Sequence, residues 1–288
     1  MKGLLRHSFL RRVSKDISAL IGIAIVVSMV GMAIFSNFLA TQNPLEQDLK
    51  KRLIPPVYFN KGTVEHPLGT DFLGRDIMSR ILFGGRISLF IAFASVLIGV
   101  VIGTALGLIC GYYEGFVDNV IMRIADVQLA FPLILLVIAV IGALGPSLTN
   151  MIVVLGITSW VRFARIVRGE TLSIKEREFV MAVKAVGGND FRTLTYHILP
   201  NVMPSIIVIA TLELARIIMI ESSLSFLGLG VPIEIPSWGG MLSEGRNYLA
   251  TAWWFATFPG LAIVITILGI NLTGDWLRDL LEPRFKGR

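Results

Sequence analysis

Charge is scarce in this chain: 16% of its 288 residues are Asp, Glu, Lys or Arg, and 54% are hydrophobic. Soluble globular chains carry about 25% charged residues. The apolar residues are gathered into long uncharged runs, which is typical of membrane-spanning segments. The composition therefore excludes an ordinary soluble domain. The formal net charge of +6 does not indicate nucleic-acid binding, because the basic residues lie in the loops and tails between the runs, where they set membrane topology.

Cysteine and the common catalytic motifs are also missing. The single Cys110 lies inside an apolar run, so no disulfide framework is possible. The sequence has no G-x-x-x-x-G-K-[ST] phosphate loop and no H-E-x-x-H, C-x-x-C or G-x-S-x-G motif. We therefore predict that the chain is not an enzyme, has no catalytic residues and does not itself hydrolyse ATP. No metal site is expected, because His66 has no second histidine near it in the sequence.

We assign six apolar segments as membrane spans, each of which takes about 20 helical residues. The fourth, Thr149–Val161, is too short alone and is expected to continue to about Arg165. The first of them is too long for a signal peptide and lacks a small-residue cleavage site. We predict an all-α, polytopic membrane protein with six transmembrane helices, whose transmembrane domain covers residues 17–276. Its spans are expected at about 17–40, 87–111, 118–143, 149–165, 203–222 and 256–276.

Basic residues favour one orientation of these spans. Six spans place the tails 1–16 and 277–288 on the same side as a loop at 166–202. Counted as five in 1–16, Arg123, seven in 162–203 and four in 276–288, that side holds seventeen Lys and Arg residues, against eight in the outside loops, seven of which lie in 41–86. Because basic loops tend to stay in the cytoplasm, we expect both termini to be cytoplasmic.

Within the second run, glycines recur at every fourth residue, so one face of the expected helix is flat. Such stripes of small residues let the backbones of two membrane helices approach closely. We predict that this face packs against another span. Its members are Gly99, Gly103, Gly107 and Gly111.

The segment that follows the fourth span is the most charged and most punctuated one between long apolar runs. Ser173 and Glu176 form an S-x-x-E capping box, which predicts a helix that begins at about Ile174. Gly187 marks its end, because glycine readily adopts the left-handed conformation that closes a helix. A helix of about thirteen residues is too short to cross a bilayer.

The remainder of this segment is expected to form a second helical piece. Asn189 and Asp190 cap that piece, which ends near Pro200. Four apolar residues of the first helix share one face: Phe179, Ala182, Val183 and Val186. From the pattern alone, an amphipathic helix lying on the membrane surface is an equal interpretation.

The segment resembles the cytoplasmic coupling loop of ATP-binding-cassette importer permeases. That loop carries Glu-Ala-Ala, three further residues, a glycine and later Leu-Pro. The matching residues here are Met181-Ala182-Val183, Gly187 and Leu199-Pro200. Methionine replaces the glutamate and valine the second alanine, so no glutamate role falls to position 181.

Other strings closely resemble the second permease subunit of the peptide/nickel importers, and this resemblance covers the chain from about residue 66. The first sixty residues match in character only. The strings are HPLGTDFLGRD (66–76), SR (79–80), GRISL (85–89), GYY (111–113), DN (118–119), ESSLSFLGLG (221–230), PSWG (236–239), GDWLRD (274–279) and EPR (282–284).

The resemblance implies an inner-membrane permease subunit of an ATP-driven importer. Its cargo would be di- or oligopeptides, moved by alternating access, with nickel or another metal chelate as the alternative. The implied partners are a homologous permease, two cytoplasmic ATPase subunits that carry ATP and Mg, and an external solute-binding protein, so the chain itself binds no cofactor. The residues implied in coupling to the ATPases are Glu178, Phe179, Ala182, Val183, Val186, Gly187 and Asp190.

Charged residues inside the spans are costly unless they face a bundle interior or water. Glu213, Arg216 and Glu221 lie in the fifth span, and the first two can pair at i, i+3. They are candidates for the translocation path or, equally, for a structural lock between helices. Arg123 and Asp126 have the same spacing. These acids would also serve a secondary transporter driven by protons or sodium, although no internal repeat supports that alternative.

The loop before the second span carries three further candidates on a turn rich in proline and glycine: Asp71, Arg75 and Asp76. We interpret this turn as a salt-bridged outer loop beside the pore. In that position it can also contact a binding protein.

Overall fold

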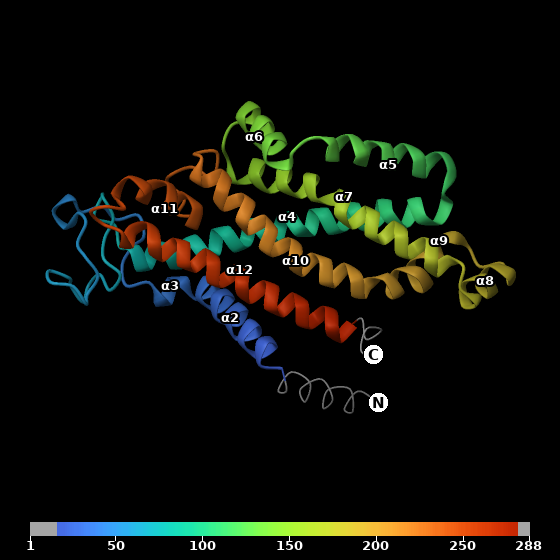
Figure 1. Cartoon of the computed structure of the whole chain (residues 1–288), viewed down its shortest axis with the longest axis horizontal. Helices are drawn as coiled ribbons and strands as arrows, with labels where there is room; N and C mark the ends of the chain where they lie inside the picture. The colour runs from blue at the N-terminus through green and yellow to red at the C-terminus, as the bar shows by residue number, and fades with distance from the viewer. Residues whose placement is uncertain (1–15, 282–288) are drawn as a thin grey trace. The chain divides into compact units, whose positions relative to one another are not determined.

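The computed structural model describes residues 16–281, and over that range the chain is helical (Figure 1). The described residues contain no strand, only an isolated bridge between Thr70 and Asp76. Among the described residues, five helices are long and apolar enough to cross a membrane. They are α2 (Ile17–Ile34), α4 (Ile77–Tyr113), α7 (Leu148–Lys175), α10 (Leu199–Phe226) and α12 (Trp254–Leu281). The predicted all-α membrane fold is confirmed, while the tail residues 1–15 and 282–288 lie outside the described part.

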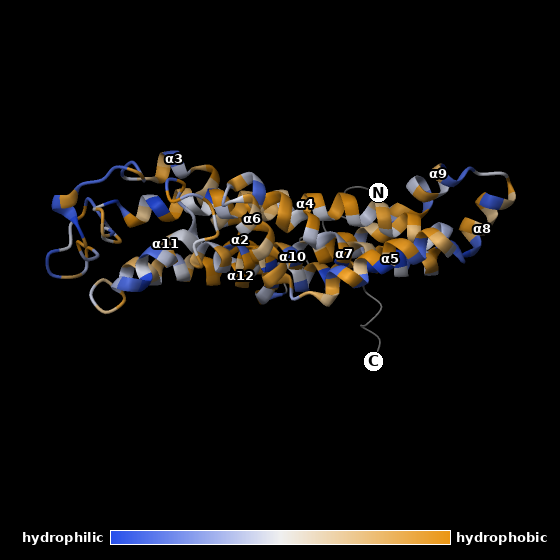
Figure 2. Cartoon of the chain, turned by 90° about the horizontal axis from the view of Figure 1, so that it is seen from above, coloured by the Kyte–Doolittle hydropathy of each residue, from blue (hydrophilic) through white to orange (hydrophobic). Residues whose placement is uncertain are grey.

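Shorter helices connect these five. They are α3 (Ser36–Leu39), η1 (Leu49–Lys51), α5 (Gly115–Ala130), α6 (Leu133–Leu144), α8 (Glu178–Ala185), α9 (Asp190–Arg192), the π-helical turn η2 (Thr193–Ile198), α11 (Trp238–Gly245) and η3 (Arg246–Tyr248). The described chain divides into two compact units. Unit 1 holds residues 16–93, 141–151 and 214–273, and unit 2 holds 94–140, 152–213 and 274–281. Figure 2 shows that hydrophobic residues dominate the long helices.

The helix expected over 118–143 is divided into α5 and α6. These two helices meet at an angle of 89°, and the six expected spans are reached only when the bent pair counts as one. The cause is Pro132, since the residue before a proline is disfavoured in the helical conformation. Phe131 is accordingly extended, with φ −94° and ψ 135°.

Three helices extend well past the predicted spans of about 87–111, 149–165 and 203–222. α4 begins at Ile77 because the carboxylate of Asp76 accepts the Ser79 N–H at 2.8 Å and caps the helix. α7 continues to Lys175, and α10 ends at Phe226. Ion pairs and hydrogen bonds allow charged residues to stay within these helices.

The predicted helix start at Ile174 is wrong. Ser173 and Ile174 belong to α7, and α8 begins at Glu178 after Arg177, which is extended with φ −75° and ψ 144°. Ile174 is only 4% exposed, so continuing α7 through it buries an apolar side chain. The S-x-x-E pattern does not distinguish the first turn of a helix from an interior turn.

The predicted helix end near Pro200 is also wrong. α9, η2 and α10 form one helical stretch over 190–226. The Leu199 N–H donates to the Leu194 carbonyl in the wider π pattern just before Pro200, so the missing proline N–H falls beside a turn that is already irregular. The capping prediction for Asn189 is confirmed, because its side chain accepts the Arg192 N–H at 2.9 Å.

Unit 1 contains an apolar core beneath the long segment between α3 and α4. Ile77, Met241 and Phe255 are buried in it, and the Trp254 indole N–H donates to the Thr70 carbonyl at 3.3 Å. Gly74 has φ +78°, and a Cβ there would lie 1.9 Å from the Asp48 carbonyl oxygen. Only glycine therefore fits this turn, and the segment is folded onto α11 and the start of α12.

Unit 2 is held together by the close approach of α4 and α7. A Cβ added to Gly103 would lie 2.5 Å from the Phe163 Cβ, and one added to Gly107 would lie 2.6 Å from the Ala164 carbonyl oxygen. Gly99 and Gly111 make equally close approaches to α7. The predicted packing role of the glycine stripe is confirmed, and its partner is α7.

Candidate functional site

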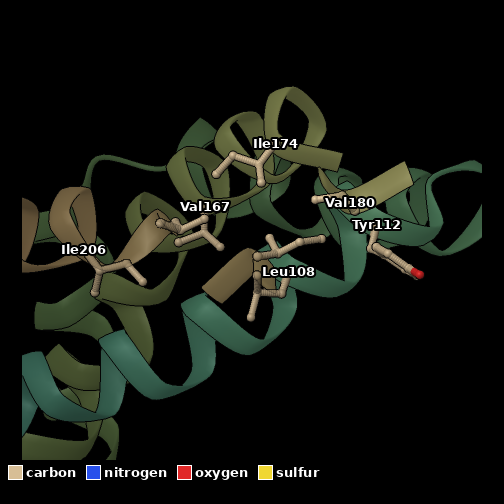
Figure 3. Packing of buried hydrophobic residues seen from close by; sticks show 8 residues of the cluster. Leu108, Tyr112, Val167, Ile174, Val180 and Ile206 are labelled. Atoms are coloured by element: carbon tan, nitrogen blue, oxygen red, sulfur yellow. The ribbon is translucent and has the colours of Figure 1, made fainter. Parts of the chain in front are cut away.

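In unit 2, α8 is anchored by one buried side chain. Val180 is fully buried in a cluster that includes Tyr112 of α4 and Ile174 of α7 (Figure 3). The remaining members are Leu108, Val167, Ile198, Val202 and Ile206. The cluster joins α8 to α4, α7 and α10.

Polar contacts fix the same end of unit 2. The Tyr112 hydroxyl donates to the Asp190 carboxylate at 2.5 Å, and the Lys184 ammonium lies 4.5 Å from the centre of the Tyr112 ring. Tyr112 thus holds both α8 and α9 to the end of α4. Gly187 has φ +81°, and the Gly188 N–H donates to the Val183 carbonyl at 2.9 Å, which confirms the predicted glycine closure of the helix.

Most of the other apolar side chains of α8 are uncovered. Phe179 is 41% exposed, Met181 50% and Val186 86%; Ala182 is exposed as well, and Val183 is half-buried. A short helix with one buried valine and several uncovered apolar residues presents a surface for another molecule.

A row of arginines on α7 pairs with acids of α5 and α10. Arg168 binds Asp118 with both ends of the guanidinium, at 2.5 and 2.6 Å. Arg165 binds Asp126, which was predicted to neighbour Arg123. Lys175, at the end of the helix, pairs with Glu114. These pairs explain how α7 stays helical through a charged stretch.

The acids of the fifth span have different surroundings. Glu213 is 1% exposed and accepts a hydrogen bond from Arg162 of α7 at 3.2 Å, a partner that the sequence did not predict. Glu221, in unit 1, is fully buried and accepts the Ser225 hydroxyl at 2.8 Å. Arg216 belongs to unit 1 as well, whereas Glu213 belongs to unit 2.

The candidate outer-loop residues form a buried network in unit 1. Asp71 pairs with Arg75, Nε to Oδ2, at 2.6 Å and with Arg80. Both arginines also reach Glu244 of α11, at 2.9 and 2.8 Å. Asp76 is the cap of α4 and lies 3.1 Å from His66 Nδ1. All of these side chains except that of Glu244 are at most 5% exposed, so they determine the shape of the segment.

An exposed pair lies on the same segment. Lys51 donates to Glu65 at 2.8 Å, and this hydrogen bond lowers the pKa of Glu65 and raises the pKa of Lys51. Because both side chains are open to solvent, the pair contributes little to stability.

Two family models match the chain. Residues 103–287 match the binding-protein-dependent transport system inner membrane component, and residues 5–56 match the N-terminal transmembrane domain of oligopeptide transport permease C. The first match alone covers more than half of the chain. The protein belongs to the permease subunits of ATP-binding-cassette importers.

Relatives of the permease extend over nearly its whole length. It is 42% identical to the dipeptide transport system permease protein DppC of Alkalihalophilus pseudofirmus, over 98% of this chain and 90% of that protein. It is 43% identical to the glutathione transport system permease protein GsiD of Escherichia coli, over 98% and 91%. The corresponding GsiD of Pectobacterium atrosepticum is 49% identical over 77% of this chain and 73% of that protein.

The fold of the permease also occurs among solved structures. A chain of the inward-facing MetNI methionine ABC transporter superposes with a TM-score of 0.58 at 20% identity, covering 71% of this chain and 97% of that chain. At this identity the likeness establishes the fold.

The permease structure adds residues that the sequence analysis missed. Val180, the buried anchor of α8, is absent from the predicted coupling set, and neither Tyr112 nor Arg162 is among the predicted partners. Val180 could have been found, because it lies three and four residues before Val183 and Lys184 on an amphipathic helix. Tyr112 and Arg162 required the fold. Within residues 16–281 no group of His, Cys, Asp and Glu side chains is arranged to hold a metal ion.

Proposed function

We propose that this permease carries di- or oligopeptides across the inner membrane as part of an ATP-driven importer. The observation that carries the proposal is α8: it is too short to cross a membrane, its apolar side chains are uncovered, and its anchor lies among the ends of three long helices. Such a helix suits the transfer of movement from an ATPase to the spans. The names of the relatives support the peptide class and do not favour the nickel alternative.

The partners follow from the family. A homologous permease would complete the pore, two cytoplasmic ATPase subunits would bind ATP and Mg, and an external binding protein would deliver cargo. We place both termini and α8 in the cytoplasm, since the regions on that side hold seventeen of the Lys and Arg residues against eight in the outside loops.

The mechanism we propose is alternating access. Phe179, Ala182 and Val186, with Val183 at the edge, would seat α8 on an ATPase, and Glu178 and Asp190 would flank that contact. Closure of the ATPase pair would move α8 as a rigid body. Val180 and Tyr112 would pass this movement to α4, while the helical stretch over 190–226 would pass it to α10.

The path of the cargo remains a proposal of its own. Glu213 and Arg216 would meet the charged ends of a peptide. A charged side chain within a membrane span is costly unless it has a partner or a function, which supports this role. Glu221 would do so only after a rearrangement that exposes it, because its carboxylate is fully buried and accepts the Ser225 hydroxyl. Asp71, Arg75 and Asp76 would shape the external surface that the binding protein contacts.

Affinity purification of the full-length chain from its native membranes in mild detergent, followed by mass spectrometry, tests this assembly. The proposal predicts recovery of a second permease and of ATPases with phosphate-loop motifs. Recovery of the chain alone, under conditions that preserve other membrane complexes, would instead favour a secondary transporter driven by protons or sodium.

A further inference from the structure

Unit 1 contains an elongated apolar cavity between α2, α4, α10 and α12, with a volume of about 510 Å³. We call it the α2 trough. On α2 its lining follows one face at helical spacing, from Val26 through Met29, Val30, Ala33 and Ile34. Every lining residue belongs to unit 1.

The trough has a polar end and an apolar end. α4 runs antiparallel to α2, because the Gln42 N–H just after α3 donates to the Ser79 hydroxyl in the first turn of α4 at 3.1 Å. Arg86 and Asn37 therefore line the same end of the trough, and Phe93 and Val26 line the other. Seven residues separate Arg86 from Phe93, which is about 10 Å of helix.

Arg86 is available to a ligand. It is exposed, and among residues 16–281 the structure gives its guanidinium no ion pair or hydrogen bond. It also lines a second cavity of about 420 Å³ next to Glu234. A free arginine at the edge of an apolar cavity offers five donors to an anion.

The position of Arg86 along α4 matches the membrane boundary. Residues 87–113 carry no charge and would extend about 40 Å, whereas the hydrocarbon core is about 30 Å thick. Arg86 thus lies at headgroup level when this stretch spans the bilayer. The trough then runs inward from that level by about 10 Å along α4 and about 16 Å along α2, roughly the thickness of one leaflet.

The trough is also open to lipid on the side of α2. Only 17% of the α2 span is buried, against 39–56% in the other four spans. Ile34 is 65% exposed and Val30 41%. α2 keeps its place through close contact with α12, where a Cβ added to Gly22 would lie 2.7 Å from the Leu272 Cβ.

We propose that the α2 trough binds one membrane phospholipid, whose phosphodiester is held by Arg86 and whose acyl chain fills the apolar part. The order of the lining, a cation at the boundary followed by about 10 Å of apolar wall, matches the order of groups in a phospholipid. Asn37 adds a neutral hydrogen-bonding group at the headgroup end.

The test uses the complete importer purified with its partners and placed in nanodiscs containing phosphatidylglycerol with a photoactivatable diazirine in the acyl chain. After illumination, cross-linked peptides are identified by mass spectrometry. The proposal predicts cross-links in 26–34 and 89–93. Arg86→Ala should lower their yield about fivefold, while Arg123→Ala, which removes an exposed arginine of α5, should leave it unchanged.

A second pair of variants tests the trough while leaving the charge of Arg86 unchanged. Ala33→Phe fills the cavity and should abolish these cross-links, whereas Ala24→Phe, on an exposed face of α2, should not. Unchanged yield in both Arg86→Ala and Ala33→Phe would overturn the proposal, as would an absence of cross-links in the native chain.

Displacement by excess inorganic phosphate would show that a free anion is the ligand. Cross-linking of a trough residue to the second permease would show that a protein helix fills the trough, and both of these results would overturn the proposal too.

Discussion

Tyr112 and Asp190 are 78 positions apart in the sequence, yet the tyrosine hydroxyl donates to the aspartate carboxylate at 2.5 Å. The bond joins the end of α4 to the start of α9. Together with the buried Val180 it makes the region around α8 part of unit 2, although most of the surface of α8 is exposed.

Removing this bond should loosen the segment between α7 and α9. Tyr112→Phe keeps the ring beneath Lys184 but loses a hydrogen bond worth about 1 kcal/mol. Trypsin should then cleave the purified complex after Arg177 and Lys184 about fivefold faster, because local opening is that much more frequent. Tyr196→Phe is the control, since Tyr196 is 73% exposed. Equal cleavage rates in the two variants would mean that the bond does not hold the segment.

Charge placed on the exposed face of α8 should separate ATP hydrolysis from transport. In Phe179→Asp the new carboxylate stays exposed and is not buried within unit 2, but it lies where apolar contact with an ATPase is proposed. We expect normal membrane insertion, continued ATP hydrolysis by the complex and at least a tenfold loss of uptake per ATP, a penalty of about 1.4 kcal/mol or more. Phe179→Leu, which keeps an apolar side chain at this position, should retain most of the native uptake.

The matched control for this charge is Phe116→Asp, on a residue that is 82% exposed at the start of α5. It should leave uptake per ATP unchanged. Gly187→Asp is expected to behave like Phe179→Asp, because φ +81° disfavours a side chain there. Normal uptake in both coupling variants would rule out α8 as the coupling element.

The ion pairs of α7 should differ in their contribution to stability. Asp118→Ala leaves Arg168 without its bidentate partner in a partly buried position, which should cost about 1–3 kcal/mol. Asp126→Ala breaks a pair whose two side chains are about half exposed, so it should cost less than about 1 kcal/mol. Thermal inactivation of the purified complex compares the two directly. A larger effect from Asp126→Ala would contradict the burial argument.

The glycine stripe gives a similarly matched pair. Gly107→Ala places a Cβ 2.6 Å from the Ala164 carbonyl oxygen, so α4 and α7 must move apart at a cost of about 1–3 kcal/mol. Gly142→Ala, on α6, meets open space within 4 Å and should be neutral or slightly stabilising. Folded yield and thermal stability in detergent measure both, and equal stability of the two variants would refute the packing role.

Local patterns in the sequence predicted much of this structure. The apolar runs located the long helices, the glycine spacing predicted a packed face, and Gly187 and Asn189 marked true helix boundaries. Each of these features depends on residues close together in the chain. The bend at Pro132 follows from a local rule as well, since the residue before a proline is disfavoured in the helical conformation, although the apolar run through it is long enough for a single span.

Other features depended on contacts between distant residues. Ser173 and Glu176 fit a capping box, yet α7 continues because Ile174 is buried against other helices. Glu213 can pair with Arg216 in its own helix, and the structure adds a hydrogen bond from Arg162 of α7. Charges inside a helix can be assigned to partners only when the neighbouring helices are known.

We propose that ATP hydrolysis by partner subunits drives peptide uptake through this permease. The most direct test of this proposal is the uptake of a radiolabelled dipeptide by proteoliposomes that contain the complete purified importer, the external binding protein and enclosed ATP. We predict uptake that requires ATP, is blocked by vanadate and does not change when proton and sodium gradients are dissipated. Uptake that persists without ATP and follows one of those gradients would contradict the account.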